Sequence, residues 1–303
     1  MRNTITRKIT EFAEEHPNVF LITGDAGFGV LEDFQCRFPD RFLNLGVAEQ
    51  NTISFASGLG LAGFKVFVYN IIPFLLYRCY EQVRNDICYQ KIPVTLLGIG
   101  SGVTYAPMGM THYSVEDVAI ARTLSNLVIL SPADPVEAEK CAEFSMKCID
   151  PVYIRVAKHG EPAIHSHNSI DIEKPLRVCE GSRVAVLFHG SISQEVLKAT
   201  AAMPTAPRVF SIPMLHPLNF NSLHTQLDEI HTLITVEEHF MEGGLGSIIS
   251  DWIAREKLPY RLHKVGIKNE FIHTIKNTPG IRQHYGLSSA QIRREIENAF
   301  TRS

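Results

Sequence analysis

The sequence predicts an α/β fold of two domains, each a mostly parallel sheet with helices on both faces. Short apolar runs such as NVFLITGD (residues 18–25) alternate with helical patterns along the chain, and strands that alternate with helices form parallel sheets. The runs lack polar alternation, which indicates strands buried on both faces. The 303 residues are enough for two domains, at about 100–200 residues each.

The first half of the chain accounts for the first of these sheets. Helices are predicted at residues 114–123, where Ser114 and Asp117 have the spacing of a capping box, and at residues 134–147, where Asp134 precedes a proline at the first helical position. Apolar runs predict strands at residues 18–25, 92–100, 126–132 and 150–156.

A polar stretch rich in His, Gly and Pro then interrupts the pattern, and a second α/β series follows. Its predicted strands and helices lie at residues 183–190, 191–203, 208–213, 231–238 and 260–266, with a further helix after GGLGS. This order predicts a first domain at residues 1–160, a linker at 161–182 and a second domain at 183–303.

Composition and charge are those of an ordinary globular protein, with 45% hydrophobic residues and a formal net charge of −3. No polybasic face or acidic tail is present, which argues against nucleic acid or a membrane surface as the main partner. The six cysteines form no C-x-x-C pair and no zinc-like cluster with histidine, so reduced thiols in a cytoplasmic protein are expected. The polar start, MRNTITRKITEF, predicts no signal peptide.

One acidic residue stands alone in a run of small and apolar residues. The stretch NLGVAEQNTISFASGLGLAG, residues 44–63, contains Glu49 and no Lys or Arg. An unpaired carboxylate near apolar surface is costly. Two explanations are open. Glu49 is either a carboxylate at the start of a helix, where the helix dipole favours a negative charge, or an acid that takes part in catalysis.

Three further features have both an ordinary and a functional explanation. One side of a predicted helix carries Phe74, Tyr77 and Tyr80. These aromatic side chains either belong to the hydrophobic core or form a surface on which a ligand packs. His112 lies in a loop after a strand. It is either an ordinary surface histidine or part of a ligand site at the carboxyl ends of the strands. The glycine run in EEHFMEGGLGS (residues 237–247) indicates an anion site at a helix start or close packing on the other domain.

Taken in order, these segments resemble the C-terminal half of transketolase-type thiamin diphosphate enzymes. GVAEQN matches the glutamate motif of the pyrimidine-binding domain, and FLLYRCY fits an F-x-x-[FY]-x-x-Y pattern. GMTHYSVED followed by LSNLVILSPADPVEA matches a G-x-T-H-x-x-x-E-D block, and VEEH…GGLGS is similar to part of the C-terminal domain. The resemblance extends from about residue 3 to residue 290.

This resemblance implies roles for the candidate residues. Glu49 would face the aminopyrimidine of thiamin diphosphate and share a proton with N1′, and an apolar setting would keep this acid close to protonated. Phe74 and Tyr77 would pack on the pyrimidine with Tyr80 beside them. His112 would reach an oxygen of the donor sugar, and the reaction would transfer a two-carbon ketol unit from a ketose to an aldose.

The resemblance also implies a partner. The segment GDA, with Asn51 further on, is not the GDG…N motif that binds Mg²⁺ and the diphosphate, so Asp25 and Asn51 are not expected to be metal ligands and no metal site is predicted. The chain is therefore expected to be one half of a split enzyme. A separate chain carrying GDG…N would supply the Mg²⁺ ligands, in an α₂β₂ assembly formed through the pyrimidine domains.

The sequence does not determine the substrate or the reaction type. Met108 and Gly100 stand where transketolases acting on sugar phosphates have an acid and a second histidine, and Arg155, Lys158 and His159 are the candidates for a phosphate contact. The same architecture serves 1-deoxyxylulose-5-phosphate synthases and the β subunits of 2-oxoacid dehydrogenases. A non-catalytic subunit is a further alternative.

Overall fold

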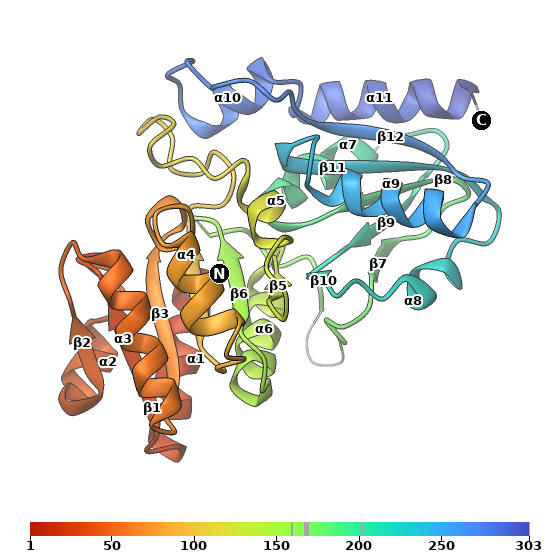
Figure 1. The fold of residues 1–303 in the computed structure, drawn as a ribbon. Helices are drawn as coiled ribbons and strands as arrows, with labels where there is room; N and C mark the ends of the chain where they lie inside the picture. The colour runs from red at the N-terminus through yellow and green to blue at the C-terminus, as the bar shows by residue number, and fades with distance from the viewer. Residues whose placement is uncertain (159, 167–169, 202, 303) are drawn as a thin grey trace.

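The structure, a computed structural model, describes residues 1–158, 160–166, 170–201 and 203–302. It contains a seven-stranded and a five-stranded sheet, both mostly parallel and covered by helices, so the predicted fold class is confirmed (Figure 1). None of the helices in these residues is both long and apolar enough to cross a membrane.

The seven-stranded sheet has the order β10-β5-β6-β4-β3-β1-β2, in which only β10 is antiparallel to its neighbour. The strands are β1 (Val19–Thr23), β2 (Phe42–Asn44), β3 (Lys65–Ile71), β4 (Thr95–Ile99), β5 (Val128–Leu130), β6 (Val152–Val156) and β10 (Met214–His216). Each run predicted as a strand in the first half therefore contains one.

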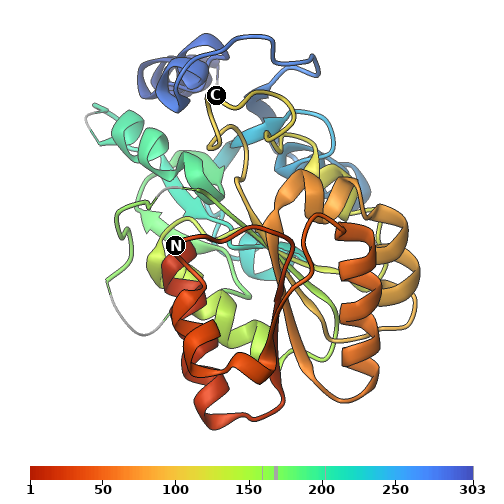
Figure 2. The ribbon, with the colours of Figure 1, turned by 90° about the vertical axis from the view of Figure 1, so that its left-hand side faces the viewer.

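Successive residues of β3 serve two different hydrophobic cores, as expected for side chains that alternate across a pleated strand. Val66 and Val68 face the core shared with α3 (Glu49–Leu61), whereas Phe67 and Tyr69 face the core shared with α1 (Arg2–Glu15). Figure 2 shows the resulting layers, with α1 and α6 (Pro135–Lys147) on one side of the sheet and α3 on the other.

The five-stranded sheet has the order β12-β11-β8-β9-β7, with only β7 antiparallel. Its elements are β7 (Leu176–Cys179), β8 (Arg183–Phe188), α7 (Ser193–Thr200), β9 (Arg208–Ser211), α8 (Phe220–His224), β11 (Ile230–Phe240), α9 (Leu245–Glu256), β12 (Arg261–Ile267), α10 (Thr278–His284) and α11 (Ser289–Arg302). β7 lies within the stretch predicted as a linker, so part of that stretch is a strand of the second sheet.

The remaining elements of the first half are short. They are α2 (Glu32–Arg37), α4 (Tyr80–Gln82), α5 (Asp117–Ala121), a 3₁₀ turn at Pro39–Arg41 and π-helical segments at Pro73–Tyr77 and Val83–Cys88. The helix at 134–147 is confirmed, since Asp134 accepts a hydrogen bond from the backbone N–H of Glu137.

The helix predicted at 114–123 is shorter than expected and begins at Asp117. The predicted capping box does not form, because both of its side chains have other partners. The Ser114 hydroxyl donates to the carbonyl of Gly100, and the Asp117 carboxylate accepts from Arg155.

Candidate active site

Three of the predicted site residues follow the carboxyl ends of β2, β3 and β4 in the first sheet, where β3 and β4 are neighbours and β1 lies between β3 and β2. Glu49 begins α3 after β2, Phe74 follows β3, and His112 lies in the loop after β4. Because these strands are parallel, their carboxyl ends meet at the same edge, where open α/β sheets place their ligands.

Glu49 is buried, but it is not unpaired as the sequence indicated. Its side chain is 7% exposed, and its Oε2 lies 2.8 Å from Nη1 of Arg78, which is 45% exposed. The Cζ atom of Arg78 also lies 4.7 Å from the centroid of the Phe74 ring, a cation–π contact. Arg78 comes from the aromatic segment, residues 74–83, rather than from the stretch around Glu49, so local sequence could not reveal the pair.

The ring of His112 also contacts Phe74. The centroids of these rings are 5.3 Å apart and the rings meet edge to face, while Tyr105 lies 5.7 Å from the His112 ring. Burial, and after it the positive charge of Lys158, lowers the pKa of His112 below its usual value. The imidazole is therefore neutral at pH 7 and can either accept or donate a hydrogen bond.

The two tyrosines of the aromatic segment have partners just before and just after α5. The Tyr77 hydroxyl donates to Oε2 of Glu116 at 3.0 Å, and the Tyr80 hydroxyl lies 2.7 Å from Oγ1 of Thr123. Both rings pack partly buried against the core beneath α3. Phe74 is thus the aromatic residue of the set that contacts both Arg78 and His112.

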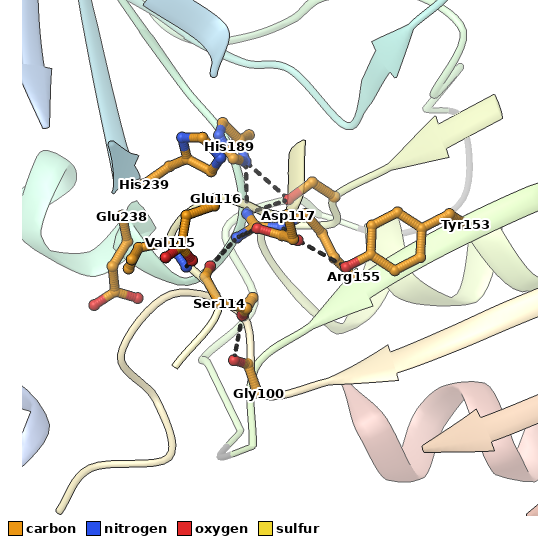
Figure 3. Close-up of polar contacts among 12 residues, drawn as sticks. Gly100, Ser114, Val115, Glu116, Asp117, Tyr153, Arg155, His189, Glu238 and His239 are labelled. Atoms are coloured by element: carbon orange, nitrogen blue, oxygen red, sulfur yellow. Dashed lines mark hydrogen bonds and ion pairs between the residues drawn. The ribbon is translucent and has the colours of Figure 1, made fainter. Parts of the chain in front are cut away.

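Arg155 has a different place from the one expected of a substrate ligand. Its side chain is 1% exposed, and its Nε donates to Asp117 Oδ2 at 2.7 Å (Figure 3). Its terminal nitrogens contact Asp117 Oδ1, the Ser131 hydroxyl and Nδ1 of His189. Arg155 therefore joins the two halves of the chain. It is not placed to contact a substrate, because its side chain is buried and its donors have partners within the chain.

Lys158 remains a candidate for an anion contact. Its Nζ lies 4.6 Å from the centroid of the Tyr105 ring, and its positive charge contributes to the lowered pKa of His112. His159, the third candidate, lies outside the described residues.

The glycine run at α9 does not offer a free anion site. The backbone N–H groups of Leu245 and Gly246 donate to the carboxylate of Glu237 at 2.7 and 2.8 Å. A buried acid of the same chain thus serves as the anion at this helix start. The packing explanation holds instead, since a Cβ placed on Gly243 would lie 2.3 Å from that of Ala119 in α5.

Asp25 and Asn51 are both exposed. Among the described residues, no group of three or more His, Cys, Asp and Glu side chains is arranged to hold a metal ion.

Both family models that match the chain come from one class of proteins. The transketolase pyrimidine-binding domain matches residues 1–163, and the transketolase C-terminal domain matches residues 173–292. The chain belongs to the transketolase family.

Within this family, the chain corresponds to the C-terminal-half subunit of a split transketolase-type enzyme. It is 31% identical over 259 residues to a subunit of the apulose-4-phosphate transketolase of Actinobacillus succinogenes, covering 84% of this chain and 83% of that protein. A solved structure described as a split gene transketolase, inactive beta4 tetramer, matches with a TM-score of 0.88 at 27% identity and covers 99% of this chain and 97% of that one.

A 1-deoxy-D-xylulose-5-phosphate synthase of Dictyoglomus thermophilum is 29% identical to this chain. The match covers 96% of this chain and 48% of that protein.

Proposed function

We propose that this chain is the pyrimidine-binding half of a thiamin diphosphate-dependent transketolase that transfers a two-carbon ketol unit from a ketose to an aldose. The observation that carries the proposal is the convergence of Glu49, Phe74 and His112 at one sheet edge in a chain of this family. Each of these residues comes from a different strand connection, so their proximity is a property of the fold rather than of one local motif.

The residues present fit the pyrimidine end of the cofactor. Glu49 offers a buried carboxylate, and Phe74 offers an aromatic ring. The guanidinium of Arg78 contacts both of these groups. When bound, thiamin diphosphate supplies the carbanion chemistry that breaks the bond next to a ketose carbonyl. Glu49 holds and returns a proton at its carboxylate, Phe74 orients the ring by stacking, and both exclude water from the pyrimidine.

His112 serves the donor sugar in this proposal. Its ring is half-buried beside Phe74, and its neutral state leaves one nitrogen to accept and one to donate. Thr111 Oγ1 lies 2.9 Å from Nδ1 and orients the ring. Lys158 lies close enough to add a positive charge for an anionic substrate, as a sugar phosphate would require.

A separate chain supplies the diphosphate and Mg²⁺ site. Mg²⁺ needs oxygen ligands in near-octahedral geometry. The described part of this chain contains no group of three or more His, Cys, Asp and Glu side chains arranged to hold a metal ion. Two large apolar side chains in the loops that follow β1 and β2, Phe28 and Val47, are 76% and 74% exposed. A partner chain at this edge would cover them, and pairing through the small-residue face of α3 would complete an α₂β₂ assembly.

The synthase relative supports a second candidate, the formation of a deoxyketose phosphate from pyruvate. Substrate use separates the two functions. The chain mixed with its diphosphate-binding partner should transfer a ketol unit from a ketose and should not decarboxylate pyruvate. The reverse pattern would favour the synthase.

A further inference from the structure

We propose that Arg78 is an internal competitor of the cofactor's pyrimidine, which must displace the guanidinium to bind. This inference rests on the proposed function, which assigns Glu49 and Phe74 to the pyrimidine. Arg78 Nη1 lies 2.8 Å from Glu49 Oε2, and its Cζ lies 4.7 Å from the Phe74 ring centroid. One planar group of this chain therefore reaches both of the groups that the pyrimidine needs.

The guanidinium and a protonated aminopyrimidine have the same recognition chemistry. Each is planar, presents N–H donors to a carboxylate and stacks on an aromatic ring. A pocket with one buried carboxylate and one stacking ring accommodates either of them. Arg78 is the side chain that connects these two groups in the described part of the chain.

Displacement of Arg78 is energetically easy. The side chain is 45% exposed, and its ion pair and its cation–π contact within the described residues are the ones to Glu49 and Phe74. An ion pair with one exposed partner and a cation–π contact at an exposed site are each weak. The arginine therefore lowers the apparent cofactor affinity without blocking the site.

Arg78 also stabilises the site when no pyrimidine is bound. A carboxylate at 7% exposure without a partner is costly, and the guanidinium supplies that partner. The arginine thereby keeps Glu49 paired until a planar donor replaces it.

The test compares dissociation constants for thiamin diphosphate in saturating Mg²⁺, measured by isothermal titration calorimetry on the chain mixed with its diphosphate-binding partner. Arg78→Met keeps the length of the side chain and removes the charge and the planar donors. It should bind thiamin diphosphate about three- to tenfold more tightly than wild type. Arg78→Lys, which keeps the charge without the planar stack, should lie between the two.

Two controls show whether the effect acts through the glutamate. Arg84→Met changes an arginine of the π-helical segment Val83–Cys88, whose side chain bonds Asn85, and this variant should bind like wild type. In a Glu49→Gln background, Arg78→Met should add less than about twofold, because the ion pair is already lost.

The outcomes separate this inference from the proposed function. Unchanged or weaker binding by Arg78→Met, with wild type still binding, would overturn the competition and leave the function standing. An equal gain in the Glu49→Gln background would also overturn it. Absence of binding by wild type and every variant would remove the proposed function, and this inference with it.

Discussion

Glu49 illustrates at the scale of single residues what sequence can and cannot predict. Its isolation among small and apolar residues identified it as a buried carboxylate, and the structure agrees that it is buried. The expectation that it lacks a partner was wrong, since Arg78 reaches it from another segment. A contact of this kind depends on how α3 packs on the aromatic segment, which no local pattern encodes.

The role of Glu49 leads to a direct prediction. Glu49→Gln keeps the shape of the side chain but cannot share the pyrimidine proton, so turnover by the assembled enzyme should fall about 10²–10⁴-fold. Steady-state ketol transfer and circular dichroism would measure activity and fold. Glu81→Gln, at an exposed position of α4, is the control. A variant within about tenfold of wild type would exclude Glu49 from the mechanism.

His112 gives a prediction about the donor. His112→Ala should raise the KM for the ketose more than the dissociation constant for thiamin diphosphate, because the ring is assigned to the sugar. Initial-rate kinetics and calorimetry on the same preparation would measure both quantities. His231→Ala, at an exposed position, should change neither. Weaker cofactor binding with unaltered donor kinetics would show that the histidine is misplaced.

At the scale of elements, strands were easier to predict than helix starts. The apolar runs correspond to β1, β4, β5 and β6, because burial of a parallel sheet on both faces leaves a strong local signal. The start of α5 was missed because Ser114 and Asp117 bond other segments instead of capping. β7 was missed because its side chains are only partly buried, which weakens the signal of a strand at a sheet edge.

The pair of Asp117 and Arg155 should stabilise the start of α5 and the neighbouring strand β6. Asp117→Asn leaves a buried guanidinium without its countercharge, and breaking a buried pair in this way costs about 3–5 kcal/mol. Urea denaturation would measure the loss. Asp251→Asn, which removes a pair to Arg122 from a 67% exposed carboxylate, should cost under about 1 kcal/mol. Equal losses for the two variants would contradict this stabilising role of the Asp117–Arg155 pair.

At the scale of the whole molecule, the two sheets are more closely joined than the sequence indicated. β10 follows β9 in the chain, yet it pairs with β5 of the first sheet. One hydrophobic core contains residues of both halves, including Val118 and Trp252. Such long-range contacts leave no periodic pattern in the sequence. Periodicity alone therefore predicted two domains joined by a simple linker, and it could not predict the contacts between them.

His189, which contacts Arg155 from the second half of the chain, gives a prediction about pH. Burial, and after it the charge of Arg155, lowers the pKa of His189 to about 3 from an ordinary value of 6.5. Between these two values the unfolded chain binds a proton that the folded chain does not, so stability falls as the pH drops through this window.

His189→Gln removes the titrating group and keeps a side chain that can accept from Arg155. Its free energy of unfolding should therefore decline less than that of wild type between about pH 6.5 and pH 4. Urea titrations at several pH values would measure the difference. Parallel declines would mean that the histidine does not contribute.

Reconstitution tests the central claim most directly. The purified chain is assayed for ketol transfer from a ketose to an aldose with thiamin diphosphate and Mg²⁺, alone and mixed with the subunit that carries the diphosphate site. We predict no turnover by the chain alone, and activity in the mixture together with a complex of about twice the heterodimer mass. Robust Mg²⁺-dependent ketol transfer by the chain alone would contradict the account, and with it the exclusion of Asp25 and Asn51 as metal ligands.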